Sequence, residues 1–594
     1  MSMAYTPPVS EMSFVMEQVA CWRDGLARVS AEVAQSDVET ILSGAAGLAA
    51  DIIAPLNLPS DRSPATWRDG DVTMPAGWKA AYRAWADAGW IGISLPAAYG
   101  GMGMPAILGT ATMEMLTSAC MAMGTMLVLT HGAVDALVAH ASDELKRLYV
   151  PKLISGVWAA TMDLTESQAG SDLGTLRTSA TPAEDGSYRI KGQKIFITFG
   201  EHDLTENIVH LVLARLPGAP AGTRGISLFI VPKFIPAADG SCGPRNDVSC
   251  AGIEHKLGIR SSPTCTMTYG ENSGAAGWLV GEPNQGLRCM FTMMNKSRLA
   301  TGLQGVAIAE RATQQALAYA RERRQGRNAG GAPAAIIEHP DVSRNVLTMM
   351  AWTAAARAIA YRAAAEIERS ASADTAASRD AACLRADLLT PLTKAFASDA
   401  GVEVASLGIQ VHGGIGYVEE AGAAQHWRDA RIAPIYEGTN GIQAIDLVMR
   451  RVLPDGGAVV VALIEEMRAI ARKTTGHADD RVAGMAERLS VAIDACAQAT
   501  QWLLDQRRQS AELLAVATPY LKLLGICLGG TLLAKSALAA TESASPVDEM
   551  RVVIARFYAE SIAVTAEGWA RNVMGSAGVV SEAAALFSSE RDSR

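Results

Sequence analysis

A single acidic residue, Glu437, stands between a tyrosine and a glycine in the segment IYEGTN, residues 435–440. Asn440, with Thr439 beside it, is typical of a helix N-cap. Apolar residues then recur at helical spacing at positions 442, 445, 448, 449 and 452. Glu437 precedes that helix, so it is not placed as a capping-box residue. A loop glutamate is either solvated or, beside a ligand, a general base.

A second candidate segment, MDLTESQAGSDLGTLRT at residues 162–178, concentrates small hydroxyl side chains. Thr165, Ser167 and Ser171 carry the hydroxyls, and Gly170 permits close backbone approach. Hydroxyls and free N–H groups bind phosphate or carbonyl oxygens. An ordinary serine and glycine turn explains the same letters equally well.

Two more segments are typical of ligand contact. In KIFITFGEHD, residues 194–203, strand alternation places Phe196 and Thr198 on one face, where they fit a flat heteroaromatic ring or a β core. In GIQVHGGIGYVEE, residues 408–420, three glycines in four positions indicate a tight turn or a ligand against bare backbone. For His412 we expect a structural role.

Composition limits the class of protein. The chain has 594 residues, a net charge of −9, 49% apolar and 5% aromatic residues, which indicates a large globular and mainly helical protein. A nucleic-acid surface would need clustered positive charge, so none is expected. Nine cysteines without a CxxC pair favour reduced thiols in the cytoplasm and no metal site. We expect no signal peptide and no membrane span.

The patterning predicts a helical leader and four domains. Helical periodicity changes to alternating β-branched runs near residue 159 and returns near residue 282. The predicted divisions are residues 1–35, 36–158, 159–281, 282–453 and 458–594, namely a leader, a helical domain, a small antiparallel β domain or barrel, a helical bundle and an extra helical domain. No strand is followed by GxGxxG, so a Rossmann site is not expected.

Four segments together, LTESQAGSDL, KIFITFG, QVHGGIGY and RDARIAPIYEGTNGIQ, resemble the acyl-CoA dehydrogenases in content and order. The resemblance covers roughly residues 40–450. The extra block after residue 460 resembles the longer subgroup that includes enzymes acting on 3-(methylthio)propanoyl-CoA. The resemblance implies the fold of that family, FAD as cofactor and an acyl-CoA thioester as substrate.

The resemblance also implies roles for individual residues. Glu437 would be the α-proton base, since Asn295, Ser297 and Thr301 offer no carboxylate where some relatives carry theirs. The implied FAD contacts are Met162, Leu164, Thr165, Ser171, Phe196, Thr198, Arg323, Gln410, Gly413, Gly414 and Thr439. The implied substrate contacts are Ser171, Asn295, Arg298, Tyr436 and Gly438.

The expected reaction is α,β-dehydrogenation of a fatty or methylthio-substituted acyl-CoA to the trans-2-enoyl-CoA. An electron-transfer flavoprotein is the implied electron acceptor. Arg323, Gln410 and the glycines would reach FAD across a subunit boundary, which favours a homo-oligomer, and we expect a dimer. Alternatives are an acyl-CoA oxidase that uses oxygen, a nucleic-acid-binding stress protein on the same fold, and a flavoprotein for other α-proton chemistry.

Overall fold

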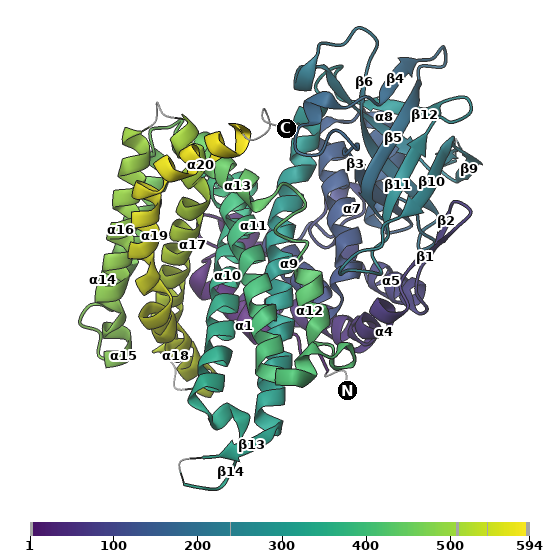
Figure 1. Ribbon diagram of the computed structural model, residues 1–594. Coiled ribbons are helices and arrows are strands. Elements are labelled where there is room, and N and C mark those ends of the chain that lie inside the picture. Colours follow the sequence, from purple (N-terminus) through teal and green to yellow (C-terminus); the bar gives the residue numbers. More distant parts are fainter. Residues whose placement is uncertain (1–3, 238, 329, 507–509, 543–544, 590–594) are drawn as a thin grey trace. The chain divides into compact units, whose positions relative to one another are not determined.

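The computed structural model describes residues 4–237, 239–328, 330–506, 510–542 and 545–589 (Figure 1). The chain divides into two compact units. One, here called the β unit, comprises residues 2–7 and 41–300, and the other, here called the bundle unit, comprises residues 8–40 and 301–594. The polypeptide passes between the units within α9 (Gly286–Glu322), since residue 301 lies inside that helix.

Helices form the first half of the β unit. After the end of α3 (Gln35–Leu48) and the short α4 (Asn57–Arg62), they are α5 (Trp78–Asp87), α6 (Ala106–Ala119), α7 (Met121–His140) and α8 (Asp143–Ile154). Cys120 has an extended backbone, with φ −155°, and separates α6 from α7. Most residues of α7 are buried and apolar, with Thr125, Thr130 and His131 buried among them, and the helix packs against β3 (Trp158–Asp163).

The second half of the β unit is an eight-stranded sheet. Its main path runs β10-β11-β5-β12-β7-β6-β3, and β4 pairs with β5 and β6. The remaining bounds are β4 (Ser179–Pro182), β5 (Tyr188–Thr198), β6 (Asn207–Arg215), β7 (Ile226–Pro232), β10 (Val248–Ile253), β11 (Thr264–Tyr269) and β12 (Ala275–Val280). The expected small β domain is confirmed, but it is not wholly antiparallel, because β3 pairs with β6 in parallel register.

Long helices build the centre of the bundle unit. They are α9 after residue 301, α10 (Pro340–Ser372), α11 (Ala376–His412), α12 (Ala423–Ala430) and α13 (Asn440–Asp446). Between α9 and α10, a two-stranded hairpin is formed by β13 (Arg324–Arg327) and β14 (Pro333–Ala335). Pro340 occupies the first turn of α10, where its missing N–H costs no helical hydrogen bond.

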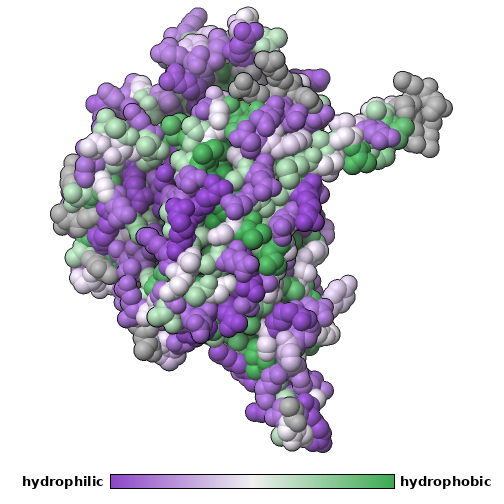
Figure 2. Space-filling model, turned by 90° about the vertical axis from the view of Figure 1, so that its left-hand side faces the viewer, coloured by the Kyte–Doolittle hydropathy of each residue, from purple (hydrophilic) through white to green (hydrophobic). Residues whose placement is uncertain are grey.

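A further helical layer follows residue 457 and packs on the centre of the bundle unit. It contains α14 (Ala458–Thr474), α15 (Asp480–Ala483), α16 (Met485–Asp505), α17 (Ser510–Ala540), α18 (Pro546–Ser561), α19 (Ala566–Gly575) and α20 (Ala577–Ser589). Figure 1 shows α17 beside α10, and α17 also contacts α11 and α13. The outer face of this layer is mainly hydrophilic in Figure 2, with separate apolar patches, so its apolar contacts are mostly internal.

The segment of residues 8–40 belongs to the same bundle unit. Its first helical pieces are α1 (Val9–Phe14) and the π-helical turn η1 (Val15–Val19). Arg551 of α18 donates to Glu11 at 2.6 Å, and Lys535 of α17 donates to the carbonyl oxygen of Val19 at 2.9 Å. The predicted leader is therefore packed against helices more than five hundred residues later in the chain.

Among the residues that the structure describes, three helical stretches are long and apolar enough to cross a membrane by length and composition: Ser36–Arg62, Met121–His140 and Ala511–Ala540. Within their most apolar windows, 22%, 89% and 83% of residues respectively are buried inside the protein. The second and third stretches are therefore core helices of their units.

Candidate active site

The loop after β3 carries the first group of predicted cofactor contacts. Met162 and Thr165 are partly exposed, Leu164 is buried, and Ser171 is exposed on the turn that follows. The amide of Ile195 in β5 donates to the carbonyl oxygen of Thr165 at 2.9 Å, so the loop lies along β5. The two segments predicted to contact a flavin ring are thus neighbours in the β unit.

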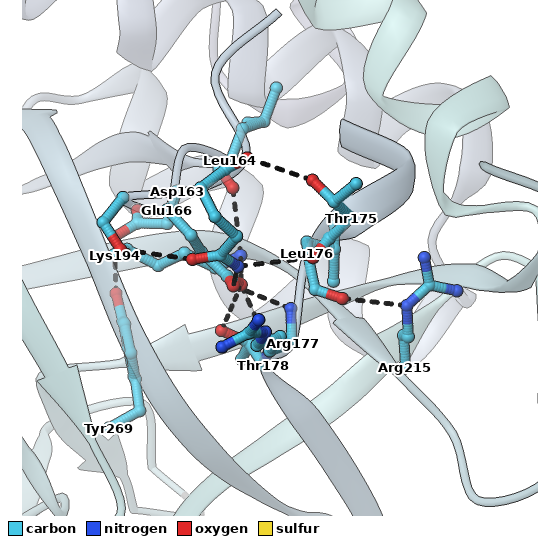
Figure 3. A network of polar contacts seen from close by, with 12 residues as sticks. Asp163, Leu164, Glu166, Thr175, Leu176, Arg177, Thr178, Lys194, Arg215 and Tyr269 are labelled. Carbon is cyan, nitrogen blue, oxygen red and sulfur yellow. Dashed lines mark hydrogen bonds and ion pairs between the residues drawn. The ribbon is translucent and has the colours of Figure 1, made fainter. Parts of the chain in front are cut away.

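A buried ion pair holds this loop closed (Figure 3). Lys194 of β5, with none of its surface exposed, donates to the Glu166 carboxylate at 2.8 Å and to the carbonyl oxygen of Leu164 at 3.0 Å. Glu166 also accepts from the amides of Arg177 and Thr178 at 2.7 and 3.0 Å. One carboxylate therefore ties together both ends of the loop. Sequence reasoning missed this pair, because residues 28 positions apart carry no local pattern.

The contacts of Glu166 keep it ionised. Burial alone would raise its pKa, but the charge and hydrogen bond of Lys194, together with hydrogen bonds from Thr178 and Arg177, lower the pKa to about 2. The neighbouring Asp163 is also buried and accepts from the Tyr269 hydroxyl at 2.5 Å. The chain on either side of Leu164 is therefore fixed by a buried carboxylate.

Phe196 projects from the sheet because β5 contains a bulge. The pairing with β11 shifts between Met267–Lys194 and Cys265–Ile197, which leaves an extra residue on the β5 side. Phe196 lies there with φ +59° and 58% of its surface exposed. A non-glycine residue in this region costs about 1–3 kcal/mol and is concentrated at functional sites. An exposed aromatic side chain close to the partly exposed Thr198 fits one face of a flat heteroaromatic cofactor.

The second group of predicted residues lies on the loop before α13 in the bundle unit. Glu437 has φ +57° and Gly438 has φ +82°, so the backbone bends through the left-handed region at both. Gln443 is buried and donates to the carbonyl oxygens of Glu437 and Gly438 at 3.2 and 3.4 Å. A side chain at position 438 would approach the Gln443 amide nitrogen within 2.7 Å, so glycine is required there on both grounds.

Tyr436, next to the candidate base, is fixed by a second glutamine. Its hydroxyl donates to the side-chain oxygen of Gln304, a buried residue of α9. Burial and the nearby charge of Glu437 raise the pKa of Tyr436, so the phenol stays neutral. Tyr436 thus positions the loop as a neutral hydrogen-bond donor, and proton transfer is left to the carboxylate.

The start of α13 differs from the sequence-based expectation. Thr439, and not Asn440, is the N-cap, and its hydroxyl accepts from the amide of Ile442 at 3.3 Å. Asn440 is the first helical residue, and its side chain turns into the bundle, where Lys394 donates to it at 2.9 Å. The prediction was wrong by one residue, because a buried polar cluster recruits the asparagine side chain and Thr439 can cap equally well.

The glycine-rich segment after α11 is open on one side. Gly413 has φ +64°, and a Cβ built on Gly413 or Gly414 would meet no atom within 4 Å. Bare backbone with open space around it is what a bound ligand needs. By contrast, a Cβ on Gly416 would lie 2.5 Å from the carbonyl oxygen of Ile409, so that glycine serves packing. The His412 ring stacks on Tyr319, which is the structural role that we expected.

Large apolar side chains are exposed around these same segments. They are Ile415, Tyr417, Val418, Ile435 and Ile442. Tyr417 has 86% of its surface exposed, and the predicted cofactor contacts Gln410 and Arg323 are exposed as well. A neighbouring groove of about 510 Å³ is lined by Asp399, Val402, Glu403, Trp427, Arg431 and Pro434, among others. This part of the bundle unit therefore presents the apolar surface that a ligand or a second chain would cover.

The two predicted CoA contacts on α9 differ in accessibility. Asn295 is exposed, whereas Arg298 is buried with 5% of its surface exposed. An exposed amide can bind a ligand directly, and a buried guanidinium can do so only from within a pocket. Among the residues that the structure describes, no group of three or more His, Cys, Asp or Glu side chains is placed to hold a metal ion.

Comparison with known families agrees with these observations. Profiles of the acyl-CoA dehydrogenase N-terminal, middle and C-terminal domains match residues 59–157, 161–271 and 284–453. A profile described as acetyl-CoA dehydrogenase C-terminal like matches residues 463–583. The chain belongs to the acyl-CoA dehydrogenase family, whose members are flavin-dependent oxidoreductases that bind FAD.

Two relatives match nearly the whole chain. The 3-methylmercaptopropionyl-CoA dehydrogenase of Ruegeria pomeroyi is 46% identical over 545 residues, covering 91% of this chain and 92% of that protein. The broad-specificity linear acyl-CoA dehydrogenase FadE5 of Mycobacterium tuberculosis is 32% identical, covering 89% of this chain and 91% of that protein. Both matches are too long to stop at residue 457, so they include much of the added helical layer.

Solved structures share the fold over almost the full length. ACDH-11 of Caenorhabditis elegans, solved in complex with C11-CoA, has a TM-score of 0.78 at 19% identity, covering 98% of this chain and 96% of that chain. An acyl-CoA dehydrogenase of Bacillus anthracis complexed with FAD has a TM-score of 0.73 at 20% identity, covering 94% and 91%. The helical, β and helical architecture with an added carboxy-terminal layer is therefore an established fold.

Proposed function

We propose that this protein removes two hydrogens from the Cα–Cβ bond of an acyl-CoA thioester and that Glu437 is the base that takes the α-proton. The observation that carries the proposal is the geometry of residues 436–438. Glu437 and Gly438 both have positive φ, and the side chains of Gln443 and Gln304 fix the loop on either side of the carboxylate. Such a backbone persists only where the surroundings hold it, and it is concentrated at functional sites.

Each residue of the loop has a defined task in the reaction. The Glu437 carboxylate accepts the proton from C2 of the thioester, and the absence of a side chain at Gly438 leaves room for the thioester group. The Gly438 N–H donates to the thioester oxygen, which carries negative charge as the proton leaves. FAD, when bound, supplies the acceptor for the hydride from C3. Phe196, Thr198, Met162 and Thr165 are the β-unit residues that would hold its ring.

The proposed substrate is 3-(methylthio)propanoyl-CoA or a short-, medium- or long-chain fatty acyl-CoA. Support comes from the similarity to the Ruegeria pomeroyi enzyme, which spans 91% of this chain. Similarity to the linear acyl-CoA dehydrogenase of Mycobacterium tuberculosis supports fatty acyl-CoAs as further candidate substrates. A difference of one methylene in a pocket changes binding by only about 1–3 kcal/mol, so several neighbouring chain lengths should react.

An anaerobic titration tests the function. The purified protein is mixed with 3-(methylthio)propanoyl-CoA and with linear acyl-CoAs of increasing length, and the loss of oxidised flavin absorbance is followed. We expect bleaching in stoichiometric amounts and formation of the trans-2-enoyl-CoA. A protein that retains FAD but is not reduced by any of these thioesters would contradict the proposal.

We propose an electron-transfer flavoprotein as the physiological electron acceptor, a homodimer as the assembly and the cytoplasm as the location. Family membership supports the acceptor, and the exposed apolar side chains around residues 415–418 support association with a second copy. An acyl-CoA oxidase is the competing enzyme. It would consume one oxygen molecule per thioester at the full rate of turnover, whereas the proposed dehydrogenase needs an added electron acceptor.

A further inference from the structure

A buried polar cluster connects α11 to the loop that carries Glu437. Asn440, three residues after Glu437, donates to the Asp399 carboxylate at 2.7 Å and to the Ser398 hydroxyl at 3.0 Å. Lys394, which has none of its surface exposed, donates to the Asn440 side-chain oxygen at 2.9 Å. Both ends of the Asn440 amide are therefore used, and the first turn of α13 is fixed relative to α11.

The part of α11 that carries these partners is held from two sides. A Cβ on Gly305 of α9 would lie 2.1 Å from the carbonyl oxygen of Ala397, so the two helix backbones are in direct contact there. On another side, a Cβ on Gly525 of α17 would lie 2.3 Å from a ring carbon of Phe396. A close-packed segment of this kind cannot shift unless its neighbours move with it.

Lys522 of α17 adds an electrostatic contact, one helical turn before Gly525. Its ammonium group lies 4.5 Å from the centre of the Trp352 ring and 5.9 Å from that of Phe396, as in cation–π contacts. Burial is the largest influence and raises the pKa of Asp399 above its usual value, while the charge of Lys522 and the hydrogen bond from Asn440 oppose that rise. Lys522 therefore favours the ionised Asp399 that accepts from Asn440.

We propose that the added carboxy-terminal layer positions the catalytic loop. Lys522 and Gly525 of α17 hold the α11 segment 394–399, and Lys394, Ser398 and Asp399 in turn hold Asn440 and the loop before it. Lys522 is thus a positioning residue for Glu437, although it belongs to the layer that follows residue 457. The inference rests on the proposed role of Glu437 and extends it to a helix that carries none of the predicted site residues.

The test measures anaerobic flavin reduction at saturating acyl-CoA in Lys522→Met, which removes the charge but keeps much of the side-chain volume. We expect the limiting rate constant of flavin reduction to fall roughly three- to tenfold, while the acyl-CoA concentration that gives half of that rate, measured in a parallel titration, stays within about twofold. The isotope effect of substrate deuterated at C2 should rise, because proton abstraction becomes slower relative to the other steps. Lys522→Arg keeps the cation over the rings and should restore most of the rate.

Lys535→Met is the matched control. It removes the same side chain from the same helix, but Lys535 donates to Val19 and Cys21 of the amino-terminal segment. This variant should lose thermal stability and keep its rate of flavin reduction. A normal rate of flavin reduction in Lys522→Met would overturn the inference, as would an equal loss of rate in Lys535→Met. If Glu437→Gln is inactive at the same time, the proposed function still stands. An active Glu437→Gln would instead remove the proposed function itself.

Discussion

The β-unit loop at residues 164–178 and the bundle-unit loop at residues 431–440 are each held by a fully buried lysine, yet the two lysines bind different partners. Lys194 donates directly to the carboxylate of Glu166. Lys394 donates to the side-chain oxygen of Asn440, and the side-chain nitrogen of Asn440 in turn donates to Asp399. One loop is thus closed by an ion pair and the other by a hydrogen-bonded chain through a neutral group.

This difference bears on how each loop responds to its surroundings. The Glu166 carboxylate takes all its donors from within the β unit, and two of them are amides of its own loop. Asp399 depends on cations that come from α11, α17 and the segment after α12. The first loop should therefore be rigid by itself, whereas the second is open to influence from the added helical layer.

The largest effect is expected from Glu437→Gln in the bundle-unit loop. Glutamine keeps the shape of the side chain but cannot accept the α-proton, so flavin reduction should slow by at least the roughly 10²–10⁴-fold that a positioned base contributes. FAD content should stay at the wild-type value. Stopped-flow reduction under anaerobic conditions measures the rate, and wild-type kinetics in this variant would remove Glu437 from its role.

The next effect is expected from Lys194→Met in the β-unit loop. It leaves the Glu166 carboxylate buried without its cation, which should destabilise the unit by about 3–5 kcal/mol. Hydrogen–deuterium exchange of β5 and of residues 164–178 reports the loss directly. The double variant Lys194→Met with Glu166→Leu should recover part of the protection, because no buried charge is then unpaired. If both variants exchange like the wild type, the ion pair does not hold the loop.

Acid should loosen the β-unit loop through protonation of Glu166. The pKa of Glu166 is about 2 in the folded protein, below its usual 4.5, so this carboxylate stabilises the fold fully above about pH 4.5 and loses that effect as the pH falls toward 2. The amount is about 3 kcal/mol. Exchange of the 164–178 amides should rise over this range, and Glu166→Gln should flatten the dependence. A variant with the wild-type profile would assign the acid response to another group.

The smallest effect is expected from Thr439→Ala, which distinguishes a helix-capping role of Thr439 from a role at the active site. Thr439 and Thr375 are N-caps of α13 and α11, and their hydroxyls accept from backbone amides at 3.3 and 3.1 Å. Thr439→Ala and Thr375→Ala should each destabilise the bundle unit by about 1 kcal/mol. Only Thr439→Ala, beside Glu437, should also slow turnover or weaken FAD binding. Equal kinetics in the two variants would limit Thr439 to a capping role.

Local patterns predicted a large part of this structure. The change to alternating runs near residue 159 and the return of helical periodicity near residue 282 coincide with the start of β3 at Trp158 and the end of β12 at Val280. The order of four short motifs was enough to indicate the family and its fold. Strand and helix periodicities depend on residues close in sequence, which is why these features could be read directly.

The features that were missed depend on distant residues or on unusual backbone. The pairs Glu166–Lys194 and Lys394–Asn440 join segments 28 and 46 positions apart, and neither spacing is periodic. The positive φ of Phe196 and Glu437 contradicts the preference of those residue types, so only the surrounding packing could reveal it. The N-cap is Thr439 and not Asn440 for the same reason, because hydrogen bonds with Lys394 and Asp399 in the bundle interior engage the Asn440 side chain.

The attachment of residues 9–26 to the last helices has a consequence for synthesis of the chain. Met12, Met16, Val19, Trp22 and Leu26 are buried, and the segment accepts hydrogen bonds from Arg369 of α10 as well as contacts from Lys535 of α17 and Arg551 of α18. At ordinary rates of translation, Lys535 and Arg551 emerge from the ribosome about half a minute or more after the segment itself. Until α17 and α18 have been synthesised, the apolar face of the first helix lacks these packing partners and is accessible to chaperones.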